Sequence, residues 1–387
     1  MLPTLRLVAA TLAASTSLAG VVAPVASGPK PLRTVDEVRT TTSVAAQMSL
    51  RQRVGQLFMV GTPATGASSA ALREISERHV GNVMLTGRSH RGVRATERVT
   101  SALQSRATRK ATDRVRLFVA TDQEGGYVQV LHGPGFSEIP TALRQGHWGP
   151  ARLRERAATW AHQLRRAGVN LDLAPVVDTV PSAQAARHNP PIGFYDREFG
   201  FTTRRVARHG VALFKGMADG HVATSAKHFP GLGRVHANTD TASGVTDRVT
   251  TRHDAYLAPF AATIRAGVRF VMMSTAYYRR LDARRPAAFS PYVIGTMLRG
   301  DLGFDGVVVS DDLGNARQVS RWRPGQRAVK FIRAGGDLVL TVNPSVLPDM
   351  YDAVLRHAKA SPSFRGKVDR AVLRILLAKQ HHHLLGR

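Results

Sequence analysis

Eight short apolar runs recur along the chain, and each is followed by glycine or polar residues and then by a stretch with helical spacing. Their apolar density is typical of strands that are buried on both faces, as in a parallel sheet. The runs are residues 54–61, 81–87, 116–123, 169–178, 223–229, 269–277, 306–312 and 337–343. Between them, helical spacing is clearest in residues 70–79, 151–168, 202–220 and 289–303. In the last of these, Ser290 is suited to an N-cap and Gly303 to a helix stop.

Strand and helix alternate eight times, so we predict an α/β fold with one domain, a (β/α)8 barrel of the TIM type. A doubly wound open sheet is the alternative that this pattern leaves. Neither GxGxxG nor GxxxxGK(S/T) follows the first run, and this counts against that alternative. We expect the barrel over residues 46–380 and a surface tail over 381–387, with histidines 381–383 exposed rather than bound to a metal.

The N-terminal residues have the layout of a secretory signal peptide. Arg6 gives a short basic start, an Ala-rich apolar run follows, and small residues surround Ala23 to Ser27. We therefore predict a signal peptide over residues 1–27 and a secreted, extracytoplasmic protein; a retained N-terminal anchor is the alternative. Residues 28–45 are rich in Pro, Thr and Ser without a clear period, and we expect them to form a linker.

The net charge and the lack of cysteine limit which partners and which kinds of site are expected. The formal net charge is +27, which favours anionic surroundings such as a cell-wall polymer. Arg and Lys are spread along the chain without a block of like charges, so nucleic acid is not the expected partner. The absence of cysteine excludes disulfides, thiolate zinc sites and a cysteine nucleophile.

Polar residues gather where the predicted strands end. Because the carboxyl ends of barrel strands meet at one mouth, these side chains are expected to form a ligand site there. They are Asp122, Gln123, Glu124, Asp178, Lys227, His228, Ser274, Thr275, Ser310, Asp311, Asp312 and Asn343. No GxSxG surrounds Ser310 and no HExxH occurs. The remaining carboxylates, lysine and histidine suit hydrolysis of a glycosidic bond, which needs a carboxylate and a separate proton donor and requires no metal or organic cofactor.

Seven segments, in the same order, resemble glycoside hydrolase family 3, and within it the single-barrel β-N-acetylhexosaminidase branch. They are residues 48–61, 122–131, 170–178, 189–200, 227–233, 285–313 and 368–376. The resemblance implies that Asp311 is the nucleophile that forms a covalent glycosyl-enzyme. It also implies that Asp122, Lys227 and His228 bind the hydroxyls of the sugar.

Other positions in these segments match the family pattern less closely or have a second interpretation. Arg197 resembles the family's sugar-contacting arginine, although two extra residues separate it here from the Ile-Gly pair that precedes it. Asp178 is interpreted as a sugar contact or, equally, as a strand-end cap. Glu124 is expected to be a structural hydrogen-bonding residue. Because neighbours in an extended strand point to opposite sides, only Asp311 of the Asp311–Asp312 pair is expected to face the mouth.

The expected proton donor is missing from this chain. The resemblance implies a His that is paired with an Asp two residues earlier, on a flexible loop after "KHFPG", but Asn238 and Asp240 stand at those positions. Asp240 with a raised pKa is our first candidate for the acid/base. His236, on the same loop, is the second. The third possibility is a barrel that has lost turnover and binds carbohydrate without cleaving it.

We therefore predict a secreted, retaining glycoside hydrolase that releases a terminal β-linked sugar through an Asp311 intermediate. N-acetylglucosamine from a cell-wall-type glycan is the expected substrate, and β-glucosidase activity is the alternative within the family. A glycan or small saccharide is the expected partner, together with electrostatic association with an anionic wall.

Overall fold

The computed structural model describes residues 35–385. The predicted signal peptide and the first part of the predicted linker lie outside this range, as do residues 386–387. Within it, none of the helices combines the length and the apolar character that crossing a bilayer would need.

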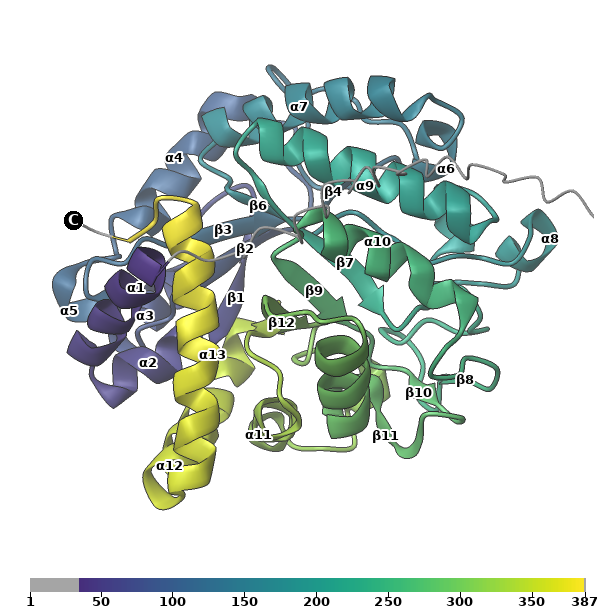
Figure 1. Ribbon diagram of the computed structural model, residues 1–387. Helices are drawn as coiled ribbons and strands as arrows, with labels where there is room; N and C mark the ends of the chain where they lie inside the picture. The colour runs from purple at the N-terminus through teal and green to yellow at the C-terminus, as the bar shows by residue number, and fades with distance from the viewer. Residues whose placement is uncertain (1–34, 386–387) are drawn as a thin grey trace, which may run out of the picture. The chain divides into compact units, whose positions relative to one another are not determined.

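The described part of the chain contains a ring of eight parallel strands (Figure 1). β1 pairs with both β2 and β13, and a bridge between Val309 and Leu338 links β12 to β13. The first and last strands are therefore joined, which confirms the (β/α)8 barrel and excludes an open sheet. Each strand lies within one of the predicted runs, except that β1 starts inside its run (54–61) and ends beyond it at Pro63. The strands are β1 (Phe58–Pro63), β2 (Asn82–Thr86), β3 (Phe118–Thr121), β6 (Leu171–Asp172), β7 (Ala223–Phe229), β9 (Phe270–Met273), β12 (Val307–Ser310) and β13 (Val339–Thr341).

Helices surround the ring, and three of the four predicted helical stretches are confirmed by α3, α7 and α9. The α-helices that follow the first strand are α3 (Ser69–Glu77), α4 (Gly92–Gln104), α5 (Arg109–Thr112), α6 (Ala142–Gln145), α7 (Pro150–Arg166), α8 (Ala183–Ala186), α9 (Thr203–Asp219), α10 (Ala258–Ala266), α11 (Pro324–Ala334), α12 (Leu347–Ala360) and α13 (Pro362–His381). The fourth stretch is a π-helix, η4 (Tyr292–Asp301). Ser290 still accepts a hydrogen bond from the Val293 amide, at 3.3 Å.

The barrel interior is filled by the alternate residues of the strands, as the two-residue period of a strand requires. These residues form a cluster of their own, which includes Met59, Met84, Phe118, Leu171, Phe270 and Leu340. Phe118 and Phe270 pack edge to face across the interior, with their ring centroids 5.2 Å apart. Residues of the opposite parity, such as Val83 and Val308, pack against the helices.

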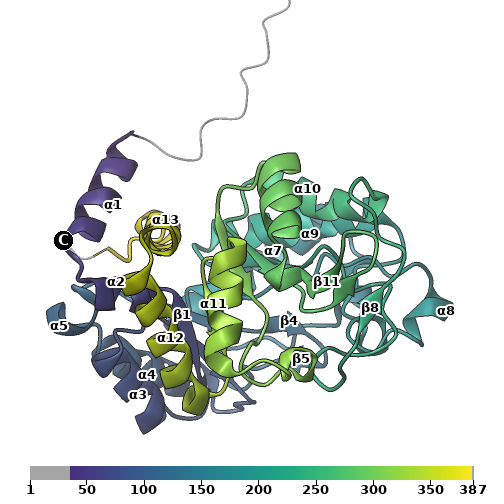
Figure 2. The same ribbon diagram turned by 90° about the horizontal axis from the view of Figure 1, so that it is seen from below.

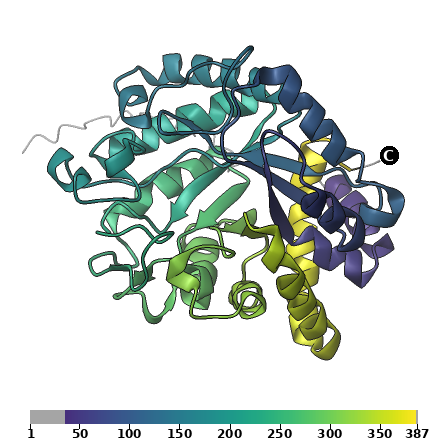
Figure 3. The same cartoon turned by 180° about the vertical axis from the view of Figure 1, so that it is seen from behind.

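The predicted linker needs correction from Val35 onward, because α1 (Val35–Gln47) is a helix that packs beside α13. Figures 1 and 3 show the two helices side by side from opposite directions. Thr41 of α1 is buried and donates a hydrogen bond to Gln380. Since most helix stability in proteins comes from such tertiary packing, the local sequence showed too little periodicity to predict this helix.

The predicted surface tail is also partly wrong. α13 runs to His381, and α2 (Leu50–Gln56) and α12 pack beside it (Figure 2). The His382 ring then meets the edge of Phe118 inside the barrel, with centroids 6.0 Å apart. Burial is the largest of the effects that lower the pKa of His382 to about 3. Residues 35–385 contain no group of three or more His, Asp or Glu side chains arranged to hold a metal ion.

Candidate active site

A cavity of about 430 Å³ opens at the carboxyl ends of the strands. Its floor consists of inward-facing apolar side chains, among them Met84, Leu173, Met272 and Leu340. Of the polar residues predicted at the strand ends, its walls carry Asp122, Lys227, His228, Asp311 and Asp312, and the others do not line it. A pocket of this size, with an apolar floor and a few convergent polar groups, is suited to a small ligand.

Strand parity explains which polar residues reach the cavity. Val307 and Val309 of β12 face the barrel interior, and Asp311 continues their alternation into the cavity. Asp312, of the opposite parity, borders the cavity too, but its carboxylate accepts the backbone N–H groups of Gly314, Asn315 and Val342. Asp312 therefore orders the segment after the strand, while Asp311 is the carboxylate available to a ligand.

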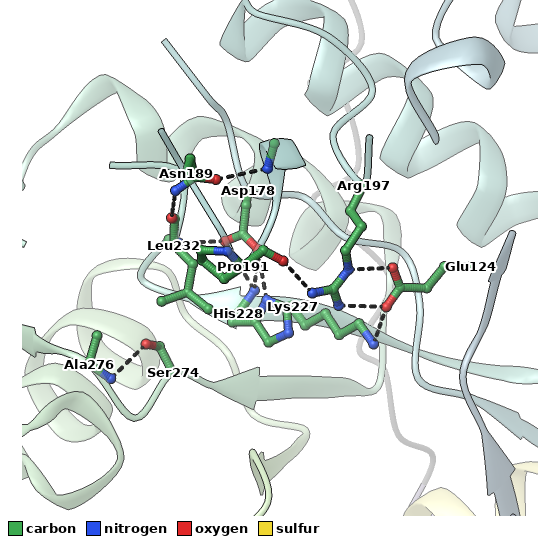
Figure 4. A network of polar contacts seen from close by, with 12 residues as sticks. Glu124, Asp178, Asn189, Pro191, Arg197, Lys227, His228, Leu232, Ser274 and Ala276 are labelled. Atoms are coloured by element: carbon green, nitrogen blue, oxygen red, sulfur yellow. Dashed lines mark hydrogen bonds and ion pairs between the residues drawn. The ribbon is translucent and has the colours of Figure 1, made fainter. Parts of the chain in front are cut away.

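Two cations, Lys227 and Arg197, form a network with two carboxylates beside the cavity, and Figure 4 shows the part of it around Glu124. Lys227 Nζ lies 2.6 Å from Asp122 Oδ1 and 2.6 Å from Glu124 Oε1. Arg197 donates two hydrogen bonds, of 2.7 and 2.8 Å, to the carboxylate of the same Glu124. It donates a third, of 2.6 Å, to the Pro191 carbonyl. The structure thus brings Arg197 to the cavity despite the two extra residues before it.

Electrostatics keep this network ionised. Burial alone would raise the pKa of Glu124, but Arg197 and Lys227 outweigh it and lower that pKa to about 2. Burial opposes the charge of Lys227, and the carboxylates of Asp122 and Glu124 nevertheless raise its pKa. Glu124 is therefore a permanent anion that orients two cations, as its predicted structural role requires, and it cannot donate a proton at neutral pH.

Asp178 does not border the cavity; it lies behind His228 and is fully buried. His228 Nδ1 donates to Asp178 Oδ2 over 2.8 Å, and the Leu232 amide donates to Asp178 Oδ1 over 2.8 Å. The strand-end cap is thus the alternative that the geometry supports. His228 itself borders the cavity, with its ring orientation held by this contact.

The loop after β7 brings Asp240 to the cavity and leaves His236 outside it. Asp240 lies at the mouth, where its side chain is in contact with solvent on one side and with protein atoms on the other. The desolvation by these protein atoms, and then the charge of Asp311, raise the pKa of Asp240 to about 6. Asn238 Oδ1 accepts the Asp240 amide over 2.9 Å. His236 is exposed and lines a separate hollow with His188, whose carbonyl lies 3.2 Å from its Nδ1. Our second candidate for the acid/base is therefore not placed to act.

The same loop is tied to the segment after β12. The Arg317 amide donates to the Asp240 carbonyl over 3.1 Å, and the Gln318 amide donates to the Thr239 carbonyl over 3.0 Å. These backbone contacts join Thr239 and Asp240 to the segment that follows Asp311.

Residues 49–378 match the family profile described as the glycosyl hydrolase family 3 N terminal domain. The chain belongs to glycosyl hydrolase family 3. The match covers nearly all of the described residues, so this family 3 protein is a glycoside hydrolase whose barrel and cavity form one domain.

Relatives and solved structures agree with this assignment. The chain is 32% identical over 325 residues to a beta-hexosaminidase of Xylella fastidiosa (strain M23), a match that covers 82% of this chain and 92% of that protein. The crystal structure of a beta-N-acetylhexosaminidase from Beutenbergia cavernae DSM 12333 is 54% identical, with a TM-score of 0.86, and covers 87% of this chain and 99% of that one. A family 3 beta-N-acetylglucosaminidase from Paenibacillus sp. str. FPU-7 is 33% identical, with a TM-score of 0.79, and covers 88% of this chain and 64% of that one.

Sequence reasoning missed two groups of residues at the site of this family 3 hydrolase. Asp172 has the opposite parity to the interior residues Leu171 and Leu173 and is fully buried; its Oδ1 accepts the Gln123 amide over 3.0 Å and so supports the segment between Asp122 and Glu124. A charged residue inside an apolar run was the available signal. Tyr127 and Tyr195 border the cavity mouth, and for Tyr195 the signal was the two extra residues before Arg197.

Proposed function

We propose that the protein is a retaining β-N-acetylhexosaminidase that releases a terminal β-linked N-acetylglucosamine from a glycan. The observation that carries this proposal is that Asp311 and Asp240 border one cavity, with a pKa of about 6 for Asp240. One carboxylate is thereby available as nucleophile and the other can hold a proton near neutral pH. The β-hexosaminidase names of the relatives support the choice of sugar.

In the proposed first step, an Asp311 carboxylate oxygen attacks the anomeric carbon of the bound sugar. Asp240 gives its proton to the glycosidic oxygen as the bond between that oxygen and the anomeric carbon breaks, and the leaving group departs as an alcohol. The sugar is then held as an ester of Asp311 with inverted configuration.

In the second step, Asp240 acts as a base. It takes a proton from a water molecule whose oxygen attacks the anomeric carbon, and the ester bond to Asp311 breaks. The second inversion restores the β configuration. Both aspartates return to their starting protonation states, so the cycle consumes only water.

The network on the cavity wall serves the sugar in this proposal. Asp122 and Lys227 have polar atoms beside the cavity, and so do Arg197 and His228. They bind the sugar hydroxyls and fix the anomeric carbon against Asp311. Because Glu124 and Asp178 already orient these groups, little conformational entropy is lost when the sugar binds.

The test is an assay of the purified protein on chromogenic β-N-acetylglucosaminide and β-glucoside. We expect hydrolysis of the first. Asp311→Asn should lower kcat by at least about 10³-fold, and Asp240→Asn should lower it by about 10²- to 10⁴-fold. His236→Ala serves as the control and should stay close to wild type. Preference for the glucoside would reassign the sugar, and a loss confined to His236→Ala would overturn Asp240.

We also propose that the protein is secreted and acts on a cell-wall glycan. The signal-peptide layout of residues 1–27 and the net charge of +27 support this proposal. Attraction to an anionic polymer weakens as salt screens it. The fraction of protein bound to the wall should therefore fall as salt is raised, and a salt-independent distribution would count against wall association.

A further inference from the structure

Large apolar side chains that are exposed gather at the mouth of the cavity. Among the described residues, Tyr127 is 60% exposed, Phe194 64% and Tyr195 40%. Tyr127 and Tyr195 border the cavity, and their ring centroids lie 6.0 Å apart. Phe194 meets Tyr195 edge to face at 5.2 Å. We call these three residues the aromatic rim.

Two separate loops supply the aromatic rim. Tyr127 follows Gly125 and Gly126, whose φ angles of +102° and +56° favour glycine, in the turn between β4 (Gln123–Gly125) and β5 (Val128–Gln129). Arg88 Nη2 donates to the Tyr127 carbonyl over 2.6 Å. Phe194 and Tyr195 lie in the short helix η1 (Gly193–Tyr195), within the stretch that carries the two extra residues before Arg197.

The base of the second loop is tied to the active-site network (Figure 4). Asn189 is buried; its Oδ1 accepts the Gly193 amide over 2.9 Å, and its Nδ2 donates to the Leu232 and Val235 carbonyls over 2.8 Å each. On the other side, Arg197 binds the Pro191 carbonyl and Glu124. The backbone is thus held in place while the rings stay exposed, an arrangement suited to binding a ligand rather than to packing a core.

The position of the aromatic rim decides which part of a substrate it meets. The sugar that is transferred to Asp311 needs the hydroxyl-binding groups of the inner wall, Asp122 and Lys227 among them. The group that departs must extend past Asp240 toward the mouth. The faces of a β-linked N-acetylglucosamine ring carry only C–H groups, because all the substituents of this ring are equatorial, and such faces pack well on aromatic rings.

We propose that the aromatic rim is a leaving-group subsite that stacks the pyranose ring on the reducing side of the cleaved bond. The substrate class is then a β-linked oligosaccharide, and not a single sugar on a small alcohol. This inference rests on the proposed function, since that function places the cleaved bond above Asp311. Beyond the proposed function, the inference specifies that the leaving group is itself a sugar.

The kinetic test compares two substrates that differ in the leaving group. The first is a β-1,4-linked N-acetylglucosamine trimer, and the second is N-acetylglucosaminyl β-fluoride, whose leaving group has no ring. We expect Tyr195→Ala, Phe194→Ala and Tyr127→Ala each to lower the trimer-to-fluoride ratio of kcat/KM, by about tenfold for the ring that contributes most. Tyr195→Phe keeps the ring and should keep the ratio. An unchanged ratio in all three alanine variants would overturn the subsite.

The control is Val249→Ala, which removes a side chain that is 51% exposed and does not border the cavity. It should leave the ratio and the fluoride rate unchanged. A drop of the ratio in this control would show that the readout follows general destabilisation, and the subsite would then lose its support.

A binding measurement separates this inference from the proposed function. In the Asp311→Asn variant, calorimetry should show that the trimer binds at least about tenfold more tightly than free N-acetylglucosamine. Adding Tyr195→Ala should abolish most of this difference in affinity. If the wild type fails to cleave the fluoride while this difference persists, the proposed function fails and the sugar subsite stands. Equal affinity for trimer and monomer would overturn the subsite whatever the turnover.

Discussion

Asp240 and Glu124 both carry a carboxylic acid, and their surroundings shift its pKa in opposite directions. Asp240 lies where desolvation and the charge of Asp311 raise its pKa to about 6. Glu124 is fully desolvated, but Arg197 and Lys227 beside it lower its pKa to about 2. Side chains of one chemical type can thus hold or release a proton at the same pH, according to the charges around them.

The raised pKa of Asp240 predicts the pH dependence of the reaction. A general acid works only while it is protonated, so kcat/KM on a substrate with a poor leaving group should fall above about pH 6, by up to about tenfold per pH unit. Asp240→Asn should lack this alkaline fall. A dinitrophenyl glycoside, whose leaving group needs little protonation, should be less sensitive to pH. An activity on the poor leaving group that stays flat to pH 8 would contradict the role of Asp240.

At the scale of elements, Asp178 joins the segment after β6 to the end of β7. It is fully buried and accepts hydrogen bonds from the His228 ring and amide and from the Leu232 amide. Asn189 makes a second link, between the loop that carries Phe194 and Tyr195 and the loop after β7. The mouth of the barrel is therefore held together by polar side chains that do not touch the cavity themselves.

Replacing Asp178 should destabilise this part of the barrel mouth. Asp178→Ala leaves several buried donors unpaired, and we expect a loss of unfolding free energy on the order of 3 kcal/mol together with a lower kcat/KM. Asp178→Asn retains an acceptor and should therefore recover part of the unfolding free energy and part of kcat/KM. Asp219→Ala, which removes an exposed ion pair with Arg154, is the control and should have little effect. Denaturant unfolding and kinetics measure the two losses, and an unaffected stability in Asp178→Ala would contradict the anchoring role.

At the scale of the whole described molecule, the C-terminal helix closes the end of the barrel opposite the active site. Lys379 of α13 is fully buried, and its Nζ donates to Gln56 Oε1 over 2.7 Å and to the Gly81 carbonyl over 2.8 Å. No carboxylate is among these partners, and burial lowers the pKa of Lys379 well below its ordinary value.

This buried lysine should make stability depend on pH. The unfolded chain binds a proton that the folded chain binds less well, so wild-type stability should rise with pH up to the ordinary lysine pKa of about 10.4. Lys379→Met removes this dependence, and its thermal midpoint relative to wild type should be higher at pH 7 than at pH 10. Lys359→Met, at an exposed position of α12, is the control. A midpoint difference that does not change with pH would show that Lys379 is charged in the folded state.

Much of the fold could be predicted because its pattern is local. Buried parallel strands require apolar runs, and all eight runs proved to be strands. The inward direction of Asp311 followed from parity within one strand. α1 could not be predicted, because its stability depends on contacts with α13, more than three hundred residues along the chain.

By itself, the sequence determined the barrel, the family and the strand-end residues Asp122, Lys227, His228 and Asp311, since these depend on runs and motifs only a few residues long. Tertiary structure alone decided which residues reach the cavity, namely Asp240 rather than His236, and Arg197 despite the extra residues. It also decided that Asp178 lies behind His228 and does not reach the cavity. The path of a loop depends on its partners elsewhere in the chain, such as Asn189 and Arg317, and residue spacing does not reveal those partners.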